Sequence, residues 1–158
     1  MPQKKKKKII SSIIATNRRA RYDYEILETF EAGIILTGSE VKSLRARKSS
    51  INEAFASEKH GELYLNNAYI AEYSKATPTH EPREARKLLL HKREISKLLN
   101  SIKRKGMTVI PLSLYFNKRG LAKVQIAQAI GKQRHDKREN IKQRDWSRQK
   151  EQLLRNRN

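Results

Sequence analysis

The N-terminal half of the chain places apolar and polar residues in short alternating segments, a pattern typical of β-strands. Tyrosine and isoleucine at 22, 24 and 26 alternate with Asp23, Glu25 and Leu27, and a short apolar run at 33–37 lies between two glycines. Each segment predicts a strand. Two more strands are expected at 51–57 and 63–69, joined by a turn at 60–61, where His-Gly breaks the pattern.

The C-terminal half of the body predicts one further pair of strands. Residues 108–116 and 121–130 are rich in β-branched and apolar side chains and flank the turn sequence Asn-Lys-Arg-Gly at 117–120. This arrangement predicts a β-hairpin with a four-residue loop. Pro111 lacks a backbone N–H, so we expect its strand to lie at a sheet edge or to bulge there. The Thr- and Pro-rich segment 74–82 predicts a loop.

Two helices are expected beside these strands. Ser39 is a typical helix N-cap, and the residues after it predict two or three turns with basic side chains near their end. The clearer helix has one apolar stripe at helical spacing, formed by Ile95, Leu98, Leu99 and Ile102. Gly106 occupies a position typical of a helix C-cap.

Composition divides the chain into a folded body and two tails. Residues 1–16 are lysine-rich, which predicts a disordered basic N-terminal tail, and residues 17–130 predict the body. Residues 131–158 carry ten basic and four acidic side chains with few large apolar ones, among them Trp146. We expect this basic C-terminal tail to be disordered when free and helix-prone on a partner.

The elements together predict a mainly β fold with flanking helices. Strands and helices do not alternate as they do in parallel sheets. We expect a small antiparallel β-barrel of about six strands with two or three helices at its edges. An OB-type barrel is one such architecture and commonly binds oligonucleotides.

Charge changes the picture most. The 158 residues include 36 Lys and Arg against 16 Asp and Glu, a net charge of +20. Such an excess destabilises the folded chain by self-repulsion, which a polyanion relieves. Solubility is the alternative explanation, although acidic residues serve solubility better. Cysteine is absent, and no apolar run approaches the roughly 18 residues of a membrane span.

Candidate catalytic chemistry is sparse. The sequence contains no glycine-rich phosphate loop, and its four histidines show no metal-ligand spacing. Asp23, Glu25 and Glu28 are close in sequence but alternate along a predicted strand, so they do not form a metal-binding cluster. We therefore expect no enzyme activity, no cofactor and no metal site.

Basic segments with tyrosines among them favour RNA binding. The excess of positive charge recurs at 18–21, 42–48, 83–105 and 131–150. Within the third segment, the basic residues precede the predicted helix or follow its polar side: Arg83, Arg86, Lys87, Lys92, Arg93 and Lys97. Repeated basic segments favour an extended polyanion surface because each neutralised phosphate releases counterions. Tyr22 is flanked by arginines and is the best candidate to stack on an unpaired base, although any single tyrosine is also a normal core residue.

Six motifs in order carry a resemblance to a known family. They are Asn17–Arg21, Phe30–Gly33, Gly38–Arg45, Arg86–Leu90, Pro111–Tyr115 and Asp136–Arg138. With these motifs the chain resembles the SsrA-binding protein family, SmpB, from residue 17 to about residue 150.

The resemblance implies a function for each part of the chain. Members of this family have an OB-type barrel that binds the tRNA-like domain of transfer-messenger RNA (tmRNA, or SsrA RNA). They deliver this RNA to stalled ribosomes for trans-translation, which combines ribosome rescue with nascent-peptide tagging. The C-terminal tail then occupies the decoding centre and the empty mRNA channel as a helix. The resemblance also implies a monomer of the bacterial cytoplasm, sharing its RNA with an elongation factor and alanyl-tRNA synthetase.

Charge and resemblance together nominate two sets of residues. The candidates for tmRNA binding are Arg18, Arg19, Arg21, Tyr22, Glu31, Lys42, Arg45, Lys48, Leu89 and His91. The candidates for ribosome binding by the tail are Lys132, His135, Asp136, Lys137, Arg138 and Trp146. Two positions depart from the family pattern. Tyr22 stands where the family usually has His, and Arg47 replaces a usual Gly, which puts the end of the preceding helix in question.

Two other functional classes stay open from the residues alone. A structural ribosomal protein is also small, basic and tailed, but it would accompany every ribosome stoichiometrically. A nuclease or RNA-modifying enzyme would need clustered carboxylates or a nucleotide pocket.

Overall fold

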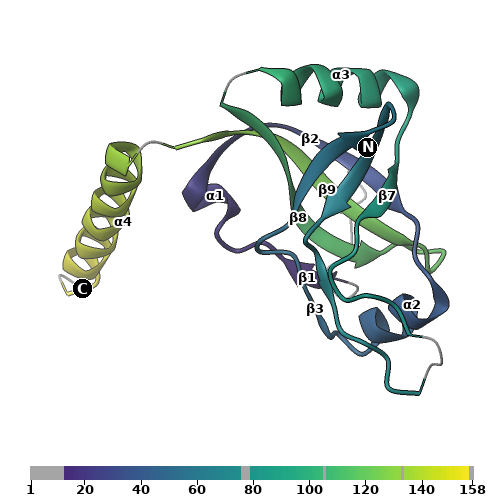
Figure 1. Cartoon of the computed structure of the whole chain (residues 1–158). Coiled ribbons are helices and arrows are strands. Elements are labelled where there is room, and N and C mark those ends of the chain that lie inside the picture. Colours follow the sequence, from purple (N-terminus) through teal and green to yellow (C-terminus); the bar gives the residue numbers. More distant parts are fainter. Residues whose placement is uncertain (1–12, 76–78, 105, 133, 157–158) are drawn as a thin grey trace, which may run out of the picture.

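The computed structural model describes residues 13–75, 79–104, 106–132 and 134–156. The predicted N-terminal tail therefore lies outside the described residues up to position 12. The strands are β1 (Ile13–Thr16), β2 (Tyr24–Ile34), β3 (Ser49–Ser50), β4 (Phe55–Lys59), β5 (Glu62–Asn66), β6 (Tyr69–Ile70), β7 (Arg86–Leu89), β8 (Met107–Phe116) and β9 (Ala122–Gly131). The helices are α1 (Ala20–Asp23), α2 (Gly38–Arg45), α3 (Lys92–Lys103) and α4 (Arg134–Arg155) (Figure 1).

Six antiparallel strands form a closed ring. The order β8-β4-β5-β7-β2-β9 closes because β9 also pairs with β8. Strand β8 pairs with two further strands at different points along its length: with β4 at Val109 and with β1 between Ser113 and Tyr115. The expectation of a mainly β fold built on an antiparallel barrel is confirmed. Closure leaves few unpaired strand edges, which suits a small β protein.

The barrel interior is filled from alternate positions of its strands and closed at its ends by helices. Leu63, Leu65, Leu88, Val124 and Ile126 are each no more than 1% exposed. Helix α3 lies across one end of the barrel and α2 lies near the other (Figure 1). They contribute the buried side chains Leu98 and Leu44 to the same core. Burying each of these leucines stabilises the fold by roughly 2 kcal/mol.

A bulge at Pro111 connects the hairpin to the start of the chain. The β8–β9 register shifts between Pro111 and Ser113, which confirms the expectation of an edge or a bulge. The Asn17 side chain donates to the Pro111 carbonyl at 3.1 Å, and the Asn17 backbone N–H donates to the Leu112 carbonyl at 2.8 Å. The bulged strand is thereby tied to the residues that follow β1.

The first predicted strand was wrong in its start and in its end. Residues 20–23 form the short helix α1, and Ala20 packs with Ala127 and Ala129 in a second apolar cluster outside the barrel. This long-range contact overrides the local alternation around Tyr22. Strand β2 then continues without a break to Ile34, through Gly33.

The boundaries of other predicted elements also moved. Residues 51–57 and 63–69 were predicted as strands, whereas β4 and β5 occupy Phe55–Lys59 and Glu62–Asn66, since a turn closes between Ile51 and Ala54. The turn at His60 and Gly61 is confirmed, with φ of 52° and 75°. The predicted hairpin at 117–120 and the stripe of α3 are also present.

Two expectations about helix ends were wrong. The N-cap of α2 is Thr37, not Ser39, because Thr37 and Glu40 form a reciprocal capping box. Helix α3 ends at Lys103 with Arg104 as its C-cap, and Gly106 instead provides the positive φ of 81° that leads into β8.

The N-terminal end of the described chain differs from the tail we expected. Residues 13–16, assigned to the N-terminal tail, form β1, which is held by its pairing to β8. Residues 134–155 form the single helix α4, which extends away from the barrel (Figure 1). Disorder of this segment in the free protein stays a prediction.

Candidate nucleic-acid interface

The arginines before β2 are exposed, and buried residues beside them hold this segment against the barrel. Asn17 and Ala20 are buried, whereas Arg18, Arg19 and Arg21 are exposed. The Asn17 contacts to the β8 bulge hold the turn, so its arginines project from a fixed backbone. The structure therefore brings these three candidates together.

Tyr22 lies beside the same arginines. The Arg19 guanidinium lies over the Tyr22 ring at 5.6 Å from its centroid, and its Nε lies 3.7 Å from the Asp23 carboxylate. Arginine stacked on an aromatic face is oriented by a cation–π contact. Tyr22 therefore presents a planar ring from α1 beside the exposed arginines.

The outer face of β2 carries Glu31. The Tyr115 hydroxyl of β8 donates a hydrogen bond to Glu31 Oε2. Strand β9 lies between the two, because Glu31 pairs with Gln125 and Tyr115 pairs with Lys123. Burial, and then the Glu31 carboxylate, raise the pKa of Tyr115 well above its usual range. Sequence reasoning missed Tyr115 as a partner of Glu31, since 84 residues separate them.

Leu89 extends this face on the other side of β2. It pairs with Gly33 and is 51% exposed. A side chain at Gly33 would crowd Leu89, because an added Cβ would lie 3.2 Å from the Leu89 Cβ. The exposed Ile35 and Leu121 lie two residues beyond the pair Gly33–Lys123. These residues form an apolar surface next to Glu31.

His91 follows this surface at the start of α3. It occupies the N-cap position, and its backbone N–H donates to Glu94 Oε1 at 3.2 Å. Its side chain is exposed. The chain from Leu89 to His91 therefore leads directly from the barrel face to the helix that closes the barrel end.

The basic residues of α2 lie on a helix whose other side is buried. Lys42 and Arg45 of α2 are exposed, as is Lys48 in the turn after the helix, and the Lys42 ammonium lies 5.2 Å from the centroid of the Tyr73 ring. Ser43 donates to the Ala71 carbonyl at 2.6 Å on the opposite side. The helix thus presents its cations outward.

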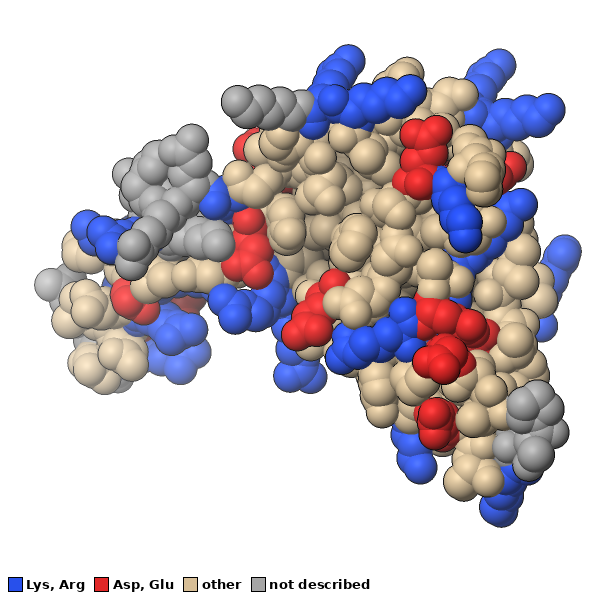
Figure 2. All heavy atoms as spheres, in the orientation of Figure 1, with Lys and Arg blue, Asp and Glu red and all other residues tan. Residues whose placement is uncertain are grey.

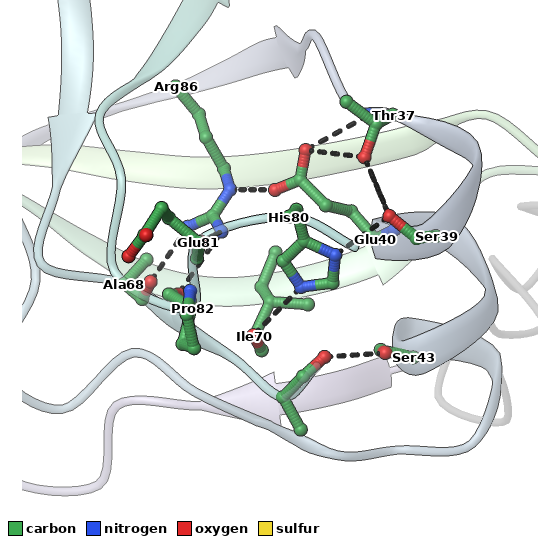
Figure 3. Close-up of polar contacts among 11 residues, drawn as sticks. Thr37, Ser39, Glu40, Ser43, Ala68, Ile70, His80, Glu81, Pro82 and Arg86 are labelled. Atoms are coloured by element: carbon green, nitrogen blue, oxygen red, sulfur yellow. Dashed lines mark hydrogen bonds and ion pairs between the residues drawn. The ribbon is translucent and has the colours of Figure 1, made fainter. Parts of the chain in front are cut away.

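Arg86 was predicted to belong to a basic surface cluster, and this is wrong. It is 3% exposed and forms an ion pair with the Glu40 carboxylate, which is 2% exposed. The remaining guanidinium donors bond to the carbonyls of Ala68, Glu81 and Pro82 at 2.7 to 3.2 Å (Figure 3). The sequence carried a signal that we missed: Arg86 and Leu88 alternate with Lys87 and Leu89, the period of a strand with one face buried.

His80 completes this buried polar network. Its Nε2 lies 3.0 Å from the Ile70 carbonyl, and its Nδ1 lies 2.9 Å from Ser39 Oγ. A carbonyl only accepts, so Nε2 carries the proton in this contact. His80 therefore joins the loop after β6 to the first turn of α2, a structural role (Figure 3).

Arg47 adopts the backbone conformation that ends α2, although it is not a glycine. It has a φ of 59° directly after the C-cap Ala46, so a non-glycine residue adopts the left-handed conformation. This conformation costs a side-chain-bearing residue roughly 1–2 kcal/mol. The Arg47 N–H donates to the Leu44 carbonyl at 2.9 Å and its Nη1 to the Ile13 carbonyl at 3.4 Å.

The tail candidates begin on the body and continue into α4. Lys132 donates through its backbone N–H to the Asp23 carbonyl at 2.9 Å and through Nζ to the Arg21 carbonyl at 3.0 Å. His135, Asp136 and Lys137 lie in the first turn of α4, and Arg138 is exposed in the second. Trp146 is 68% exposed. A shallow groove beside the helix is lined by Lys132, Gln143, Arg144, Ser147 and Arg148.

Charge is spread widely over the surface. Figure 2 shows lysine and arginine side chains around α3 and beside α4, with acidic side chains between them. Within the described ranges, no group of three or more His, Asp or Glu side chains is arranged to hold a metal ion. No helix of the described part is long and apolar enough to cross a membrane.

Comparison with known proteins shows the family. The model of the SmpB protein family matches residues 14–156. The SsrA-binding protein of Azorhizobium caulinodans is 54% identical over 158 residues, covering 99% of both chains. That of Brucella anthropi is 56% identical over 153 residues, covering 96% of this chain and 97% of the relative.

A solved structure agrees with these relatives. A chain described under "tmRNA-SmpB: a journey to the center of the bacterial ribosome" is 54% identical and superposes with a TM-score of 0.64. The match covers 80% of this chain and 92% of that chain. This chain, with its barrel and its exposed basic and apolar surfaces, therefore belongs to the SmpB family.

Proposed function

We propose that this protein binds the tRNA-like domain of tmRNA and delivers it to stalled ribosomes for trans-translation. In this proposal the barrel binds the RNA, and the C-terminal tail occupies the decoding centre and the empty mRNA channel. The observation that carries it is the match to SsrA-binding proteins over nearly the whole chain, at 54 to 57% identity. The solved relative described with tmRNA and the ribosome supports both partners.

The surfaces of the body suit a structured RNA with unpaired bases. Exposed arginines at 18, 19 and 21 and the basic side of α2 offer cations to phosphates. Tyr22, Leu89 and the apolar surface beside Glu31 offer contacts to base faces. RNA loops present both kinds of group, whereas a regular A-form helix presents mainly phosphates and 2′-hydroxyls.

The tail suits a second partner because the part of α4 after residue 140 buries almost nothing. All of its side chains from Ile141 to Arg155 are exposed, Trp146 and Leu153 among them. Helices in proteins gain most of their stability from packing an apolar face. A helix that lacks such packing needs a partner, and ribosomal RNA supplies phosphates for its basic residues and bases for Trp146. His135, Asp136, Lys137 and Arg138 would then contact the decoding centre.

Similarity to SsrA-binding proteins supports the rest of the proposal. The protein acts by binding, without a cofactor, in the bacterial cytoplasm and as a monomer. An elongation factor and alanyl-tRNA synthetase act on the same RNA and therefore meet the complex.

Recovery of the bound RNA tests this function. The full chain, tagged and expressed in bacteria, is captured from a lysate, and the co-purified RNA is sequenced. We expect tmRNA to be enriched far above other small RNAs, and the protein to be substoichiometric on total ribosomes but enriched on stalled ones. One copy on every ribosome, without tmRNA enrichment, would instead indicate a structural ribosomal protein.

A further inference from the structure

We propose that Tyr115 is a positioning residue for Glu31, and that the Glu31 carboxylate it holds accepts hydrogen bonds from an unpaired guanine of the bound RNA. This inference rests on the proposed function and adds to it a base-specific contact. It also explains why an acidic side chain stands on a surface that has to meet a polyanion.

The positions of the two residues come from the barrel. Strand β9 pairs with β8 on one side and with β2 on the other, which puts Tyr115 and Glu31 on opposite neighbours of one strand. Strand neighbours lie about 4.8 Å apart, so the phenol spans β9 across the outer face to reach Glu31. The barrel therefore fixes the distance between the phenol and the carboxylate.

Glu31 differs from most other paired acids of the body. Glu28 lies 2.5 Å from Lys97, Glu53 lies 3.4 Å from Arg83, and Glu40 pairs with Arg86. Among the described residues, Tyr115 is the hydrogen-bond partner of the Glu31 carboxylate, and no lysine or arginine forms an ion pair with it. An exposed carboxylate without a cation repels phosphates, so on an RNA surface it reduces affinity unless it accepts specific hydrogen bonds.

The hydrogen bond leaves the carboxylate with free acceptor sites. An ionised carboxylate offers about four lone-pair sites on its two oxygens, and Tyr115 uses one of them on Oε2. Two oxygens side by side match two N–H donors side by side, and guanine has such a pair in N1–H and N2–H on its Watson–Crick edge. The amino groups of adenine and cytosine provide one donor position each, so guanine is preferred.

The phenol stays a donor throughout the physiological range. Burial and the neighbouring carboxylate raise the pKa of Tyr115, so its hydroxyl does not ionise near neutral pH. A neutral hydroxyl beside an ionised carboxylate donates to it, and such charge-assisted bonds are short and directional. Glu31 is thereby held as an acceptor before the RNA arrives.

The surface next to Glu31 offers an exposed apolar side chain to a base. Gly33 lies two residues further along β2 on the same face and is flanked by Leu89 on one side and Lys123 on the other. Gly33 is buried beneath the Leu89 side chain, whose Cβ would lie 3.2 Å from a Cβ added at Gly33, and Leu89 itself is 51% exposed. A base stacked on the exposed Leu89 side chain would direct its edge towards Glu31 and leave its phosphate near Lys123.

A double-mutant cycle on the full chain tests the positioning role. Affinity for a transcript of the tRNA-like domain is measured for the wild type, Y115F, E31A and the double variant, with unfolding curves recorded for each. We expect Y115F to weaken binding about fivefold and E31A about tenfold, each a loss of one charge-assisted hydrogen bond or more. The double variant should bind like E31A, because Y115F has no carboxylate to position in that background.

Other outcomes would overturn the proposal. A fivefold loss from Y115F in the E31A background as well would show that the phenol acts on the fold and not on Glu31. The slope of log affinity against log salt should be the same for Y115F and the wild type, because no cation is removed. Y64F is the matched control: Tyr64 lies on β5 beside Lys59, away from Glu31, and its variant should bind normally.

Base substitution tests the identity of the contact. Each unpaired guanosine of the transcript is replaced in turn by adenosine. We expect one replacement to weaken wild-type binding about tenfold and to have no effect on E31A. Equal effects on both proteins at every position would overturn the guanine contact. A wild-type protein that bound this transcript no better than an unrelated tRNA would instead overturn the proposed function itself.

Discussion

Glu40 of α2 and Arg86 of β7 form a fully buried ion pair that joins elements 46 residues apart in sequence. Both side chains are 2% exposed. Glu40 also accepts from the Thr37 backbone at 3.0 Å, and Arg86 donates to three carbonyls of the chain before β7. The pair therefore fixes α2, with its outward Lys42 and Arg45, against the barrel.

Removing one charge of this pair should be strongly destabilising. E40Q keeps the size of the side chain but leaves the Arg86 guanidinium buried without a counter-charge. Breaking a buried pair on one side typically costs about 3–5 kcal/mol. We expect this loss in the free energy of unfolding, measured by urea denaturation. E53Q is the control, because the exposed Glu53–Arg83 pair should contribute less than about 1 kcal/mol. Equal effects of the two variants would contradict the structural role.

Truncation after Gly131 should separate the two proposed binding surfaces. Strand β9 ends at Gly131, so the barrel and its candidate RNA residues are retained, and the only contacts of the arginine segment described above that are lost are the Lys132 bonds to the Arg21 and Asp23 carbonyls. We expect affinity for the tRNA-like domain to fall less than threefold, whereas peptide tagging in a reconstituted translation system with stalled ribosomes should be abolished. A large loss of RNA affinity in the truncated chain would show that the tail belongs to the tmRNA surface.

Arg18 should contribute to RNA binding through charge alone. It is exposed next to the Asn17 anchor, so R18A should leave the free energy of unfolding unchanged within about 0.5 kcal/mol. If Arg18 neutralises one phosphate, the slope of log affinity against log salt should become shallower by about 0.7–0.9. N17A provides the comparison: it should lower stability as well as affinity, because the buried Asn17 side chain bonds to Pro111. An unchanged salt slope for R18A would place Arg18 outside the interface.

The ionisation of Tyr115 should appear in the stability of the protein at high pH. Its pKa in the folded state is raised, chiefly by burial and then by Glu31. The contribution of the phenol is therefore complete below its unfolded pKa of about 10 and is lost as pH rises above that value. We expect the stability difference between wild type and Y115F to be constant from pH 6 to 9 and to shrink above pH 10. Chemical denaturation at several pH values measures it; a difference that already shrinks below pH 9 would contradict the hydrogen bond.

Local pattern alone determined much of this protein. The stripe from Ile95 to Ile102, the turn at His60 and the hairpin at 117–120 depend on residues close in sequence, and each was predicted. The net charge likewise indicated a polyanion binder, because it can be counted from the sequence without knowing the fold. The six ordered motifs identified the family, which the comparisons then showed.

Only the tertiary structure decided what depends on contacts between distant residues. The sequence predicted Arg86 to be a surface cation, but the fold places Glu40 beside it in the interior. Helix α1 forms where alternation predicted a strand, since Ala20 packs on β9. Tyr115 and Glu31 meet because closure of the barrel sets β8 and β2 on either side of β9. Sequence specifies the chemistry that each residue carries. Which residues share a site is set by strand register and ring closure, and these are fixed by the burial of a common core.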